Sequence, residues 1–478
     1  MTNQRPIKTV GDVVAQHLCT SCGACAGVCP EEAVGMALTR FGILAPVIDH
    51  DRCTICGLCV QVCPGHSFDF VAQHNRIHGT LPEHVALGPC LEVYTGYTRD
   101  EEILRVSQSG GAVSTILLFC IEKGLIDGAV VTRWRKEKPL VAETYIARTR
   151  EAVLAATGSK YNPVAAAESL RTLLATPGRF AFVGTSCQIQ AMRKAELIYP
   201  ELSDKIALYL GLHCLGVFTY HFHGQVLHKV GLGHEQVAYF RQRDKVWRGW
   251  PCDMRIVDKQ GRVFDIDAKQ SRLDPRSFFT AWRCQLCFDK ANEFCDLSFG
   301  DCRIASMHAL HARNGHDLLK GLSEFVVRTE RARGIIGQLI GGDRMVLEPA
   351  DSDAIARSIG VAGKKLGLNT FPSVARMFRL GIPAYGVRFA VAGKRHSRRS
   401  RLAALWDVIA SAYWCYVYLL LQYGWFRRAV MRIPHAWIWS FTRRSGRRVE
   451  WVEHGADSRL RMVSENRWEG DGSGGFSE

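Results

Sequence analysis

Two cysteine runs near the N-terminus constrain this chain more than any other feature of its 478 residues. Residues 19–30 read CTSCGACAGVCP and residues 53–64 read CTICGLCVQVCP, so the pattern C-x2-C-x2-C-x3-C-P occurs twice. Spacing this short lets three thiols of each run reach one centre, while the fourth thiol crosses to the other centre. The proline that ends each run removes a backbone N–H and fixes φ, which stops the turn.

This repeat has the spacing of bacterial ferredoxins and predicts two [4Fe-4S] clusters with interleaved ligands in a ferredoxin-type domain over residues 10–72. Zinc sites usually separate two C-x2-C pairs by about a dozen residues or more and do not repeat a four-cysteine run. The first expected ligand set is Cys19, Cys22, Cys25 and Cys63. The second expected ligand set is Cys53, Cys56, Cys59 and Cys29.

Length and charge limit the remaining options. The chain is too long for a ferredoxin alone and predicts two or three domains. Eighteen cysteines, and an N-terminal segment without a secretory apolar stretch, predict a cytoplasmic protein whose thiols bind metals. The net charge of +15 suits nucleic acid, an anionic membrane surface or an acidic redox partner.

From Val93 onward, strand and helix patterns alternate. Residues 71–90 show little periodicity and predict a linker, whereas the alternation that follows predicts an α/β domain over residues 90–345, with parts at about 90–165 and 175–345. Residues 237–267 predict hairpin strands that cap the site, and we expect their basic residues to be solvated.

Two loops at the starts of helices could contact a cofactor. Ser109, Gly110 and Gly111 precede the first predicted helix, where exposed N–H groups can approach a phosphate or a flavin ring. A plain N-cap turn explains the same residues, and both interpretations stay open. Gly158, Ser159, Lys160 and Tyr161 precede the next helix.

Further cysteines follow predicted strands. Cys187 and Cys214 lie at the carboxyl ends of two strands, where open α/β sheets bind ligands. With the C-x2-C pair Cys284 and Cys287 they make a plausible four-thiolate site for a third cluster. A zinc site formed by Cys284, Cys287, Cys295 and Cys302 is an equal alternative.

Five separated segments behind the cysteine runs resemble one known family. They are SQSGGAVSTILLFCIEKGLIDGAVV, GSKYNPV, FVGTSCQIQAMR, LGLHCLGV and CQLCFDKANEFCDLSFGD. In this order they are similar to the coenzyme F420 hydrogenase/dehydrogenase beta-subunit family, which includes reductases of chlorophyll intermediates. The resemblance covers roughly residues 15–330.

The resemblance implies an enzyme with FAD and iron–sulfur clusters. Such an enzyme passes electrons between a ferredoxin-type donor and a two-electron acceptor, either a deazaflavin-like coenzyme or a reducible organic substrate. The resemblance matches one flavin loop to Ser109, Gly110 and Gly111, and a second to Gly158, Ser159, Lys160 and Tyr161. It matches the family's GTPCQ loop to Thr185, Ser186, Cys187 and Gln188. It matches the remaining cysteine positions of the family's catalytic domain to Cys214, Cys284 and Cys287, and thereby favours a third [4Fe-4S] cluster.

Three departures from the family pattern leave questions open. Ser186 replaces the usual proline, Cys295 and Cys302 are extra, and the C-terminal extension is long. The fourth ligand of the third cluster could therefore differ. His213, Tyr161 and Lys160 are proton donors by type only, so no catalytic residue is assigned.

The C-terminal part has a different composition. We expect residues 395–450 to form a basic, amphipathic helical extension and residues 455–478 to be disordered. An aromatic, apolar stretch at 402–426 is flanked by basic residues, which suits a helix in the interface of an anionic membrane. A buried helix and a membrane span are the alternatives. Because much of the positive charge lies here, we expect no nucleic-acid partner.

Two classes of function remain. The first is a flavin-dependent iron–sulfur oxidoreductase, cytoplasmic or peripheral on the inner face of the membrane. The second is a non-catalytic electron-transfer subunit of a membrane-associated redox complex. The sequence leaves the oligomeric state unknown.

Overall fold

The computed structural model describes residues 6–245, 248–268, 270–271, 278–362, 365, 375, 377–391, 416, 420 and 449–453. The predicted tail at 455–478 lies outside these residues. The predicted extension at 395–450 also lies outside them, apart from positions 416, 420, 449 and 450.

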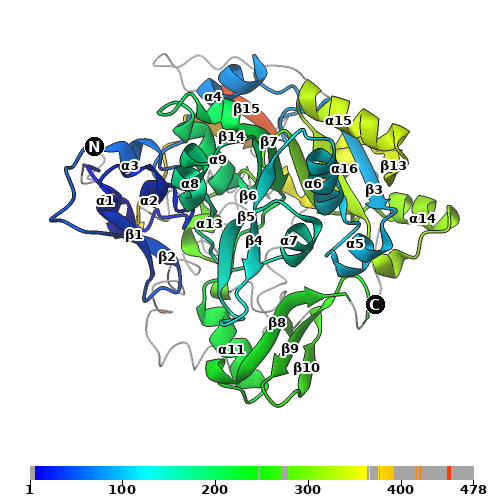
Figure 1. Ribbon diagram of the computed structural model, residues 1–478. Coiled ribbons are helices and arrows are strands. Elements are labelled where there is room, and N and C mark those ends of the chain that lie inside the picture. The colour runs from blue at the N-terminus through cyan, green and yellow to red at the C-terminus, as the bar shows by residue number, and fades with distance from the viewer. Residues whose placement is uncertain are drawn as a thin grey trace, which may run out of the picture.

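The two cysteine runs adopt matching conformations in an N-terminal module (blue in Figure 1). Its elements are α1 (Val10–Ala15), α2 (Ala24–Val28), β1 (Val34–Leu38), β2 (Leu44–Ile48) and α3 (Leu58–Gln61), with β1 and β2 antiparallel. Helices α2 and α3 each start after a left-handed glycine, Gly23 at φ 86° and Gly57 at φ 78°. Glycine adopts this conformation at little cost, so the sequence repeat becomes a structural repeat.

An eight-stranded mixed sheet forms the centre of the molecule. Its strand order is β13-β3-β12-β11-β7-β6-β4-β5. The bounds are β3 (Glu92–Thr98), β4 (Gly128–Trp134), β5 (Ala142–Ala147), β6 (Phe180–Thr185), β7 (Ile206–Leu212), β11 (Leu297–Asp301), β12 (Ser323–Val327) and β13 (Met345–Pro349). Strands β11, β7, β6 and β4 run parallel, and antiparallel strands extend both edges. The predicted mixture of helices and strands is confirmed.

Helices cover both faces of the sheet. On one face lie α5 (Glu101–Val106), α6 (Ala112–Glu122), α7 (Arg150–Ala155) and α15 (Glu330–Gly341). On the other lie η1 (Ala166–Ser169), α8 (Leu170–Ala175) and α9 (Ser186–Ala195). Each face of the sheet has its own hydrophobic core, and neighbouring residues of β6 alternate between them. Ala181 packs with α5, α6, α7 and α15, whereas Phe182 packs with η1, α8 and α9. Val28 of α2 packs in the same core as Phe182, so the N-terminal module packs directly against the large sheet and its helices.

The prediction of a linker over residues 71–90 was wrong in its first half. Helix α4 (Phe70–His78) occupies it, and the side chain of Asp69 caps its first turn by accepting from Ala72 N at 3.0 Å. Gln73 and His74 are buried on this helix. The helix buries polar side chains, so its sequence lacks an apolar stripe.

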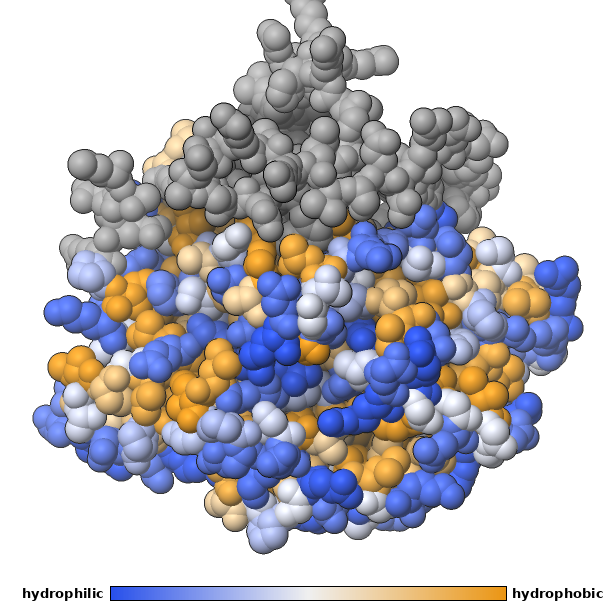
Figure 2. Space-filling view, turned by 90° about the horizontal axis from the view of Figure 1, so that it is seen from above, coloured by the Kyte–Doolittle hydropathy of each residue, from blue (hydrophilic) through white to orange (hydrophobic). Residues whose placement is uncertain are grey.

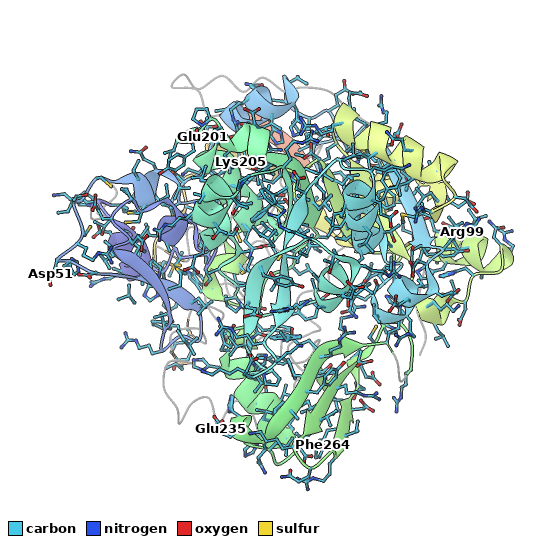
Figure 3. The ribbon with its side chains drawn as sticks, in the orientation of Figure 1. Asp51, Arg99, Glu201, Lys205, Glu235 and Phe264 are labelled. Atoms are coloured by element: carbon cyan, nitrogen blue, oxygen red, sulfur yellow. The ribbon has the colours of Figure 1, made fainter. Side chains whose placement is uncertain are left out.

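A smaller body lies below the sheet in Figure 1. It contains α11 (His221–Lys229) and the antiparallel strands β8 (Val237–Asp244), β9 (Asp253–Asp258) and β10 (Val263–Ile266). Figure 3 labels Glu235 and Phe264 here. The predicted strands over residues 237–267 are confirmed.

The described residues also form several further helices and strands. They are α10 (Leu202–Lys205), η2 (His234–Gln236), α13 (Trp282–Gln285), α14 (Ala305–Arg313), η4 (Leu318–Lys320), α16 (Ser352–Ile359), β14 (Val387–Val391) and β15 (Val449–Glu453). Strands β14 and β15 pair antiparallel, an arrangement that the sequence did not predict. Among the described residues, none of the helices has the length and apolar character needed to cross a membrane. In Figure 2 the described part of the upper face mixes hydrophobic with hydrophilic residues.

Candidate functional site

The inner of two small cavities in the N-terminal module is lined by the first predicted thiol set. Its cysteines are Cys19, Cys22, Cys25 and Cys63. This inner cavity faces the helices that cover the large sheet, because Ala167 N of η1 donates to Cys22 O at 2.8 Å. A side chain at Gly23 would place its Cβ 2.7 Å from the Cβ of Ala165. Glycine therefore permits both the left-handed turn and the close contact between domains.

The outer cavity is lined by the second predicted thiol set and is open to solvent. Its cysteines are Cys29, Cys53, Cys56 and Cys59. Cys56 is exposed, and the neighbouring Ile55 is 65% exposed. Glu31 also lines this cavity. Figure 3 shows Asp51 at the outer edge of the module, away from the sheet.

The protonation of the inner thiols fits a site built for a cationic metal centre. Burial, with the neighbouring thiols as a smaller cause, raises the pKa of Cys19 to about 12 and that of Cys22 to about 11. Burial also raises the pKa of Cys25 well above its usual value. Four thiolates could not share this space without positive charge, whereas iron replaces the protons on binding.

The third predicted thiol set is brought together from three parts of the chain. Cys187 lies in the first turn of α9, and Cys214 follows β7. Burial raises the pKa of Cys187, and the nearby thiols of Cys22, Cys214 and Cys284 raise it further. A Cβ on Gly216 would lie 3.0 Å from the Cβ of Cys284, which places the turn after Cys214 against that cysteine.

Cys287 lies beside the same group. It and Cys187 both raise the pKa of Tyr385, after burial as the larger cause. The inner cavity and this third thiol set are neighbours, because Cys22 belongs to one and acts on Cys187 of the other.

The two additional cysteines have other surroundings. Cys295 is fully buried and donates to Asn292 O at 2.9 Å, close to Gly211. Cys302 is buried near Asp301 and Glu324. Within the described ranges, no group of three or more His, Cys, Asp or Glu side chains is arranged to hold a single metal ion. A cubane binds each thiolate at a separate iron, so its ligands lie further apart than those of one ion.

The loop before α9 holds Cys187 in place. Thr185 N donates to Gln188 Oε1 at 2.8 Å, and Gln188 Nε2 donates to Val164 O at 2.9 Å. The hydroxyl of Ser186 donates to Asp289 O at 2.5 Å. Because Ser186 stands where the family usually has proline, its hydroxyl links the residue before Cys187 to the segment that follows Cys287.

The first predicted flavin loop is held tightly by the sheet. The hydroxyl of Ser109 donates to Leu322 O at 2.6 Å. Gly111 is left-handed and precedes α6. A Cβ on Gly110 would lie 2.4 Å from Gly96 O and 2.8 Å from Ser323 N.

Gly110→Ala should therefore destabilise the protein. The extra methyl group meets backbone atoms that cannot rotate away, and overpacking of this kind costs about 1–3 kcal/mol. Urea unfolding would measure the loss in the free energy of unfolding. The matched control is Gly334→Ala in α15, where a Cβ meets nothing within 4 Å. The control should be neutral or stabilised, and a Gly110→Ala protein equal to the wild type would contradict the packing argument.

The second predicted flavin loop lies beside the first. Ser159 N donates to Gln108 Oε1 at 2.9 Å, which links the loops directly. Burial lowers the pKa of Lys160 to about 7, with Arg241 as a second cause. Tyr161 O accepts from Phe218 N, so this loop also contacts the segment that follows Cys214.

Strand β8 and the residue after it bring cations to these loops. The expectation that the basic residues over 237–267 are solvated was wrong for Arg243 and Lys245, whereas the side chains of Arg248 and Arg262 are 67% and 61% exposed. Arg243 is 6% exposed and pairs with Asp301 at 2.6 Å. Lys245 is buried and donates to Ser109 O at 3.0 Å. Arg241 donates to Val106 O at 3.2 Å. The alternation of these three residues along the chain was the signal that they share one face of the strand.

A buried carboxyl group lies behind the third thiol set. Burial raises the pKa of Glu324 to about 8; Asp301 raises it further, while the hydrogen bond from Ser358 and the cations Arg303 and Lys290 oppose the shift. His213 Nδ1 lies 3.6 Å from Glu324 Oε1. Burial lowers the pKa of this histidine to about 3.

Glu324 should make the stability of the protein depend on pH. Its pKa is about 8 in the folded protein and near 4.3 when unfolded, so the folded state holds an extra proton between these values. The free energy of unfolding of the wild type should fall as pH rises from about 5 to 8. Glu324→Gln stays neutral, so its stability relative to the wild type should increase over this range, by up to about 1.4 kcal/mol per pH unit. Urea unfolding at several pH values checks this, and a constant difference would rule it out.

Comparison with known proteins assigns the family. The model described as "4Fe-4S dicluster domain" matches residues 18–66. The models of the "Coenzyme F420 hydrogenase/dehydrogenase, beta subunit", N-terminal and C-terminal, match residues 93–171 and 178–353. The beta subunit of coenzyme F420 hydrogenase from Methanosarcina barkeri is 32% identical over 223 residues, which is 45% of this chain and 71% of the relative. The chain belongs to the coenzyme F420 hydrogenase/dehydrogenase beta-subunit family.

A second relative and one solved structure are also similar to this chain. The corresponding subunit from Methanothermobacter thermautotrophicus is 29% identical over 226 residues, covering 45% of this chain and 74% of the relative. A chain in the F420-reducing [NiFe] hydrogenase complex from Methanosarcina barkeri is 22% identical, with 63% of this chain and 97% of that chain covered and a TM-score of 0.45. The dicluster domain and the family together make this chain an iron–sulfur protein of an oxidoreductase family, with a role in electron transfer.

Proposed function

We propose that this protein is an iron–sulfur flavoprotein oxidoreductase. It takes electrons from a ferredoxin-type donor and exchanges them with a two-electron acceptor, either a deazaflavin-like coenzyme or a reducible organic substrate. The observation that carries the proposal is the ordered series of thiol sets, from the exposed outer cavity through the inner cavity to Cys187 and its neighbours. This series leads from the surface towards the loops at residues 108–111 and 158–161.

The ligands follow from this order. Cys19, Cys22, Cys25 and Cys63 would hold an inner [4Fe-4S] cluster, and Cys29, Cys53, Cys56 and Cys59 an outer one. Cys187, Cys214, Cys284 and Cys287 would hold a third. When bound, clusters supply single electrons and FAD can pass two electrons as a hydride.

The residues around the two loops suit an anionic cofactor such as FAD. Arg241, Arg243 and Lys245 bring cationic groups to them, and Lys160 adds a fourth that burial leaves partly neutral. Asp301 offsets only the charge of Arg243. In the proposed site, Gly158 offers a close approach, because a Cβ there would have nothing nearer than 3.9 Å. The proposed redox partner is a ferredoxin-type donor. The relatives are named as hydrogenase subunits, which supports a redox-protein partner in general.

Cofactor analysis after anaerobic purification tests the proposal. We expect about twelve iron atoms and about twelve acid-labile sulfides per chain, with one FAD released on denaturation. Zinc together with only about eight iron atoms per chain would contradict the third cluster. Three clusters without flavin would favour a non-catalytic electron-transfer subunit and contradict the proposed enzyme.

A further inference from the structure

Two cations, the buried Arg283 and the half-buried Lys194, hold the turn that follows the last cysteine of the inner set. Arg283 is 4% exposed, and its guanidinium donates to Gly65 O at 3.2 Å and to Pro64 O at 3.3 Å. From α9, the ammonium of Lys194 donates to Cys63 O at 3.0 Å and to Ser67 O at 2.8 Å. The turn at residues 63–67 therefore lies between two positive charges that come from the catalytic domain.

These cations act on the thiols themselves. Lys194 interacts electrostatically with Cys63 and Cys22, both of the inner set. Arg283 interacts with Cys19 of the inner set and with Cys187 and Cys287 of the third set. Charge interactions are screened far less in the interior than at the surface, so these contacts count for more than ion pairs in water.

The outer cavity has the opposite surroundings. Glu31 lines it, and Asp49 and Asp51 are exposed near Cys53. The exposed Arg52 directly precedes Cys53. Arg171 donates to Cys29 O at 2.8 Å and to Ala26 O at 3.0 Å. Its side chain is 42% exposed and pairs with Glu32 at 3.2 Å, so solvent and a carboxylate screen it.

We propose that Arg283 and Lys194 raise the reduction potential of the inner cluster above that of the outer cluster. Reduction adds one negative charge to a cluster, and buried positive charge stabilises that form. The inner cluster then retains electrons that enter through the outer one. Arg283 also lowers the cost of placing an electron on the third cluster. This inference rests on the clusters of the proposed function, and it concerns electron distribution and not cluster identity.

A redox titration of the full chain, followed by electron paramagnetic resonance under anaerobic conditions, tests the inference. Lys194→Gln and Arg283→Leu should each make the inner cluster at least tenfold harder to reduce, which is a fall of about 59 mV in its midpoint potential for one electron. Arg283→Leu should lower a second midpoint as well, because it also faces Cys187 and Cys287. Lys194→Arg and Arg283→Lys keep the charge and should restore most of each shift. If Arg283→Leu does not fold, Lys194→Gln decides the result alone.

Arg171→Gln is the matched control, because it also removes a cation that donates to carbonyls beside a cysteine. Its midpoints should stay close to those of the wild type. A shift of the inner-cluster midpoint as large as that of Lys194→Gln would overturn the inference, because Arg171 pairs with Glu32 and should contribute little. Unchanged midpoints in variants with full iron content would overturn this inference while leaving the proposed function intact. A wild-type protein that contains no iron in the inner set would overturn both this inference and the proposed function.

Discussion

Replacing Cys284 with alanine should remove about four iron atoms per chain and leave about eight. The prediction follows from the position of Cys284 beside Cys187 and next to the turn after Cys214. A cubane that loses one of four thiolates loses much of its binding free energy, whereas the two cavities of the N-terminal module keep all their cysteines. Iron and sulfide analysis of the anaerobic protein measures the loss.

Cys302→Ala is the control for this experiment. Cys302 belongs to the same segment of sequence and is also buried, but its neighbours are Asp301 and Glu324. The variant should retain its iron and lose only packing free energy. Equal iron loss in both variants would favour the alternative in which Cys302 is a metal ligand.

Lys365→Met should cost about 3–5 kcal/mol of stability, the range found when one partner of a buried ion pair is removed. Lys365 Nζ lies 2.7 Å from Glu293 Oε1, and both side chains are 0% exposed. Burial alone would raise the pKa of Glu293, but Lys365 and His74 together outweigh it and lower the pKa to about 2. Methionine fills a similar volume and leaves the carboxylate buried without its cation. His74 of α4 lies 3.2 Å from the same carboxylate, so the loss should loosen α4 as well.

Lys320→Met provides the matched comparison. Lys320 pairs with Glu101 at 2.9 Å, but the two side chains are 43% and 75% exposed. Pairs of this kind contribute about 0–1 kcal/mol. Urea unfolding followed by tryptophan fluorescence should separate the two variants clearly, and hydrogen exchange should show faster exchange in α4 only for Lys365→Met. Similar losses in both variants would contradict the role of burial.

Local spacing made the two ferredoxin-type thiol sets predictable. Three cysteines within seven residues must lie close together, and only the crossing of Cys29 and Cys63 needed knowledge of the repeat. The strands β3, β4, β6 and β7 were also predictable, because their apolar runs are short and followed by turns. Spacing could not show that Cys187 and Cys284 meet, since nearly a hundred residues separate them. The family resemblance supplied that expectation.

Buried charge was the part that sequence patterns missed. Arg243, Lys194 and Arg283 resemble solvated surface residues in the sequence, because a basic side chain is usually exposed. Each is instead placed by a distant partner: Asp301 for Arg243, and the turn at residues 63–67 for the other two. Helix α4 was missed because two of its three buried residues, Gln73 and His74, are polar.

Strand β3 has a consequence for the synthesis of the protein. It is the first strand of the large sheet in the chain, yet it pairs with β12 and β13, which are the last two. A ribosome releases residues 92–98 long before residues 323–349 exist, so both backbone edges of this strand wait unpaired, exposed to association with other chains. The boundary between the two family models, at residues 171–178, therefore divides stretches of sequence similarity. It does not divide folding units, because neither half can complete the sheet alone.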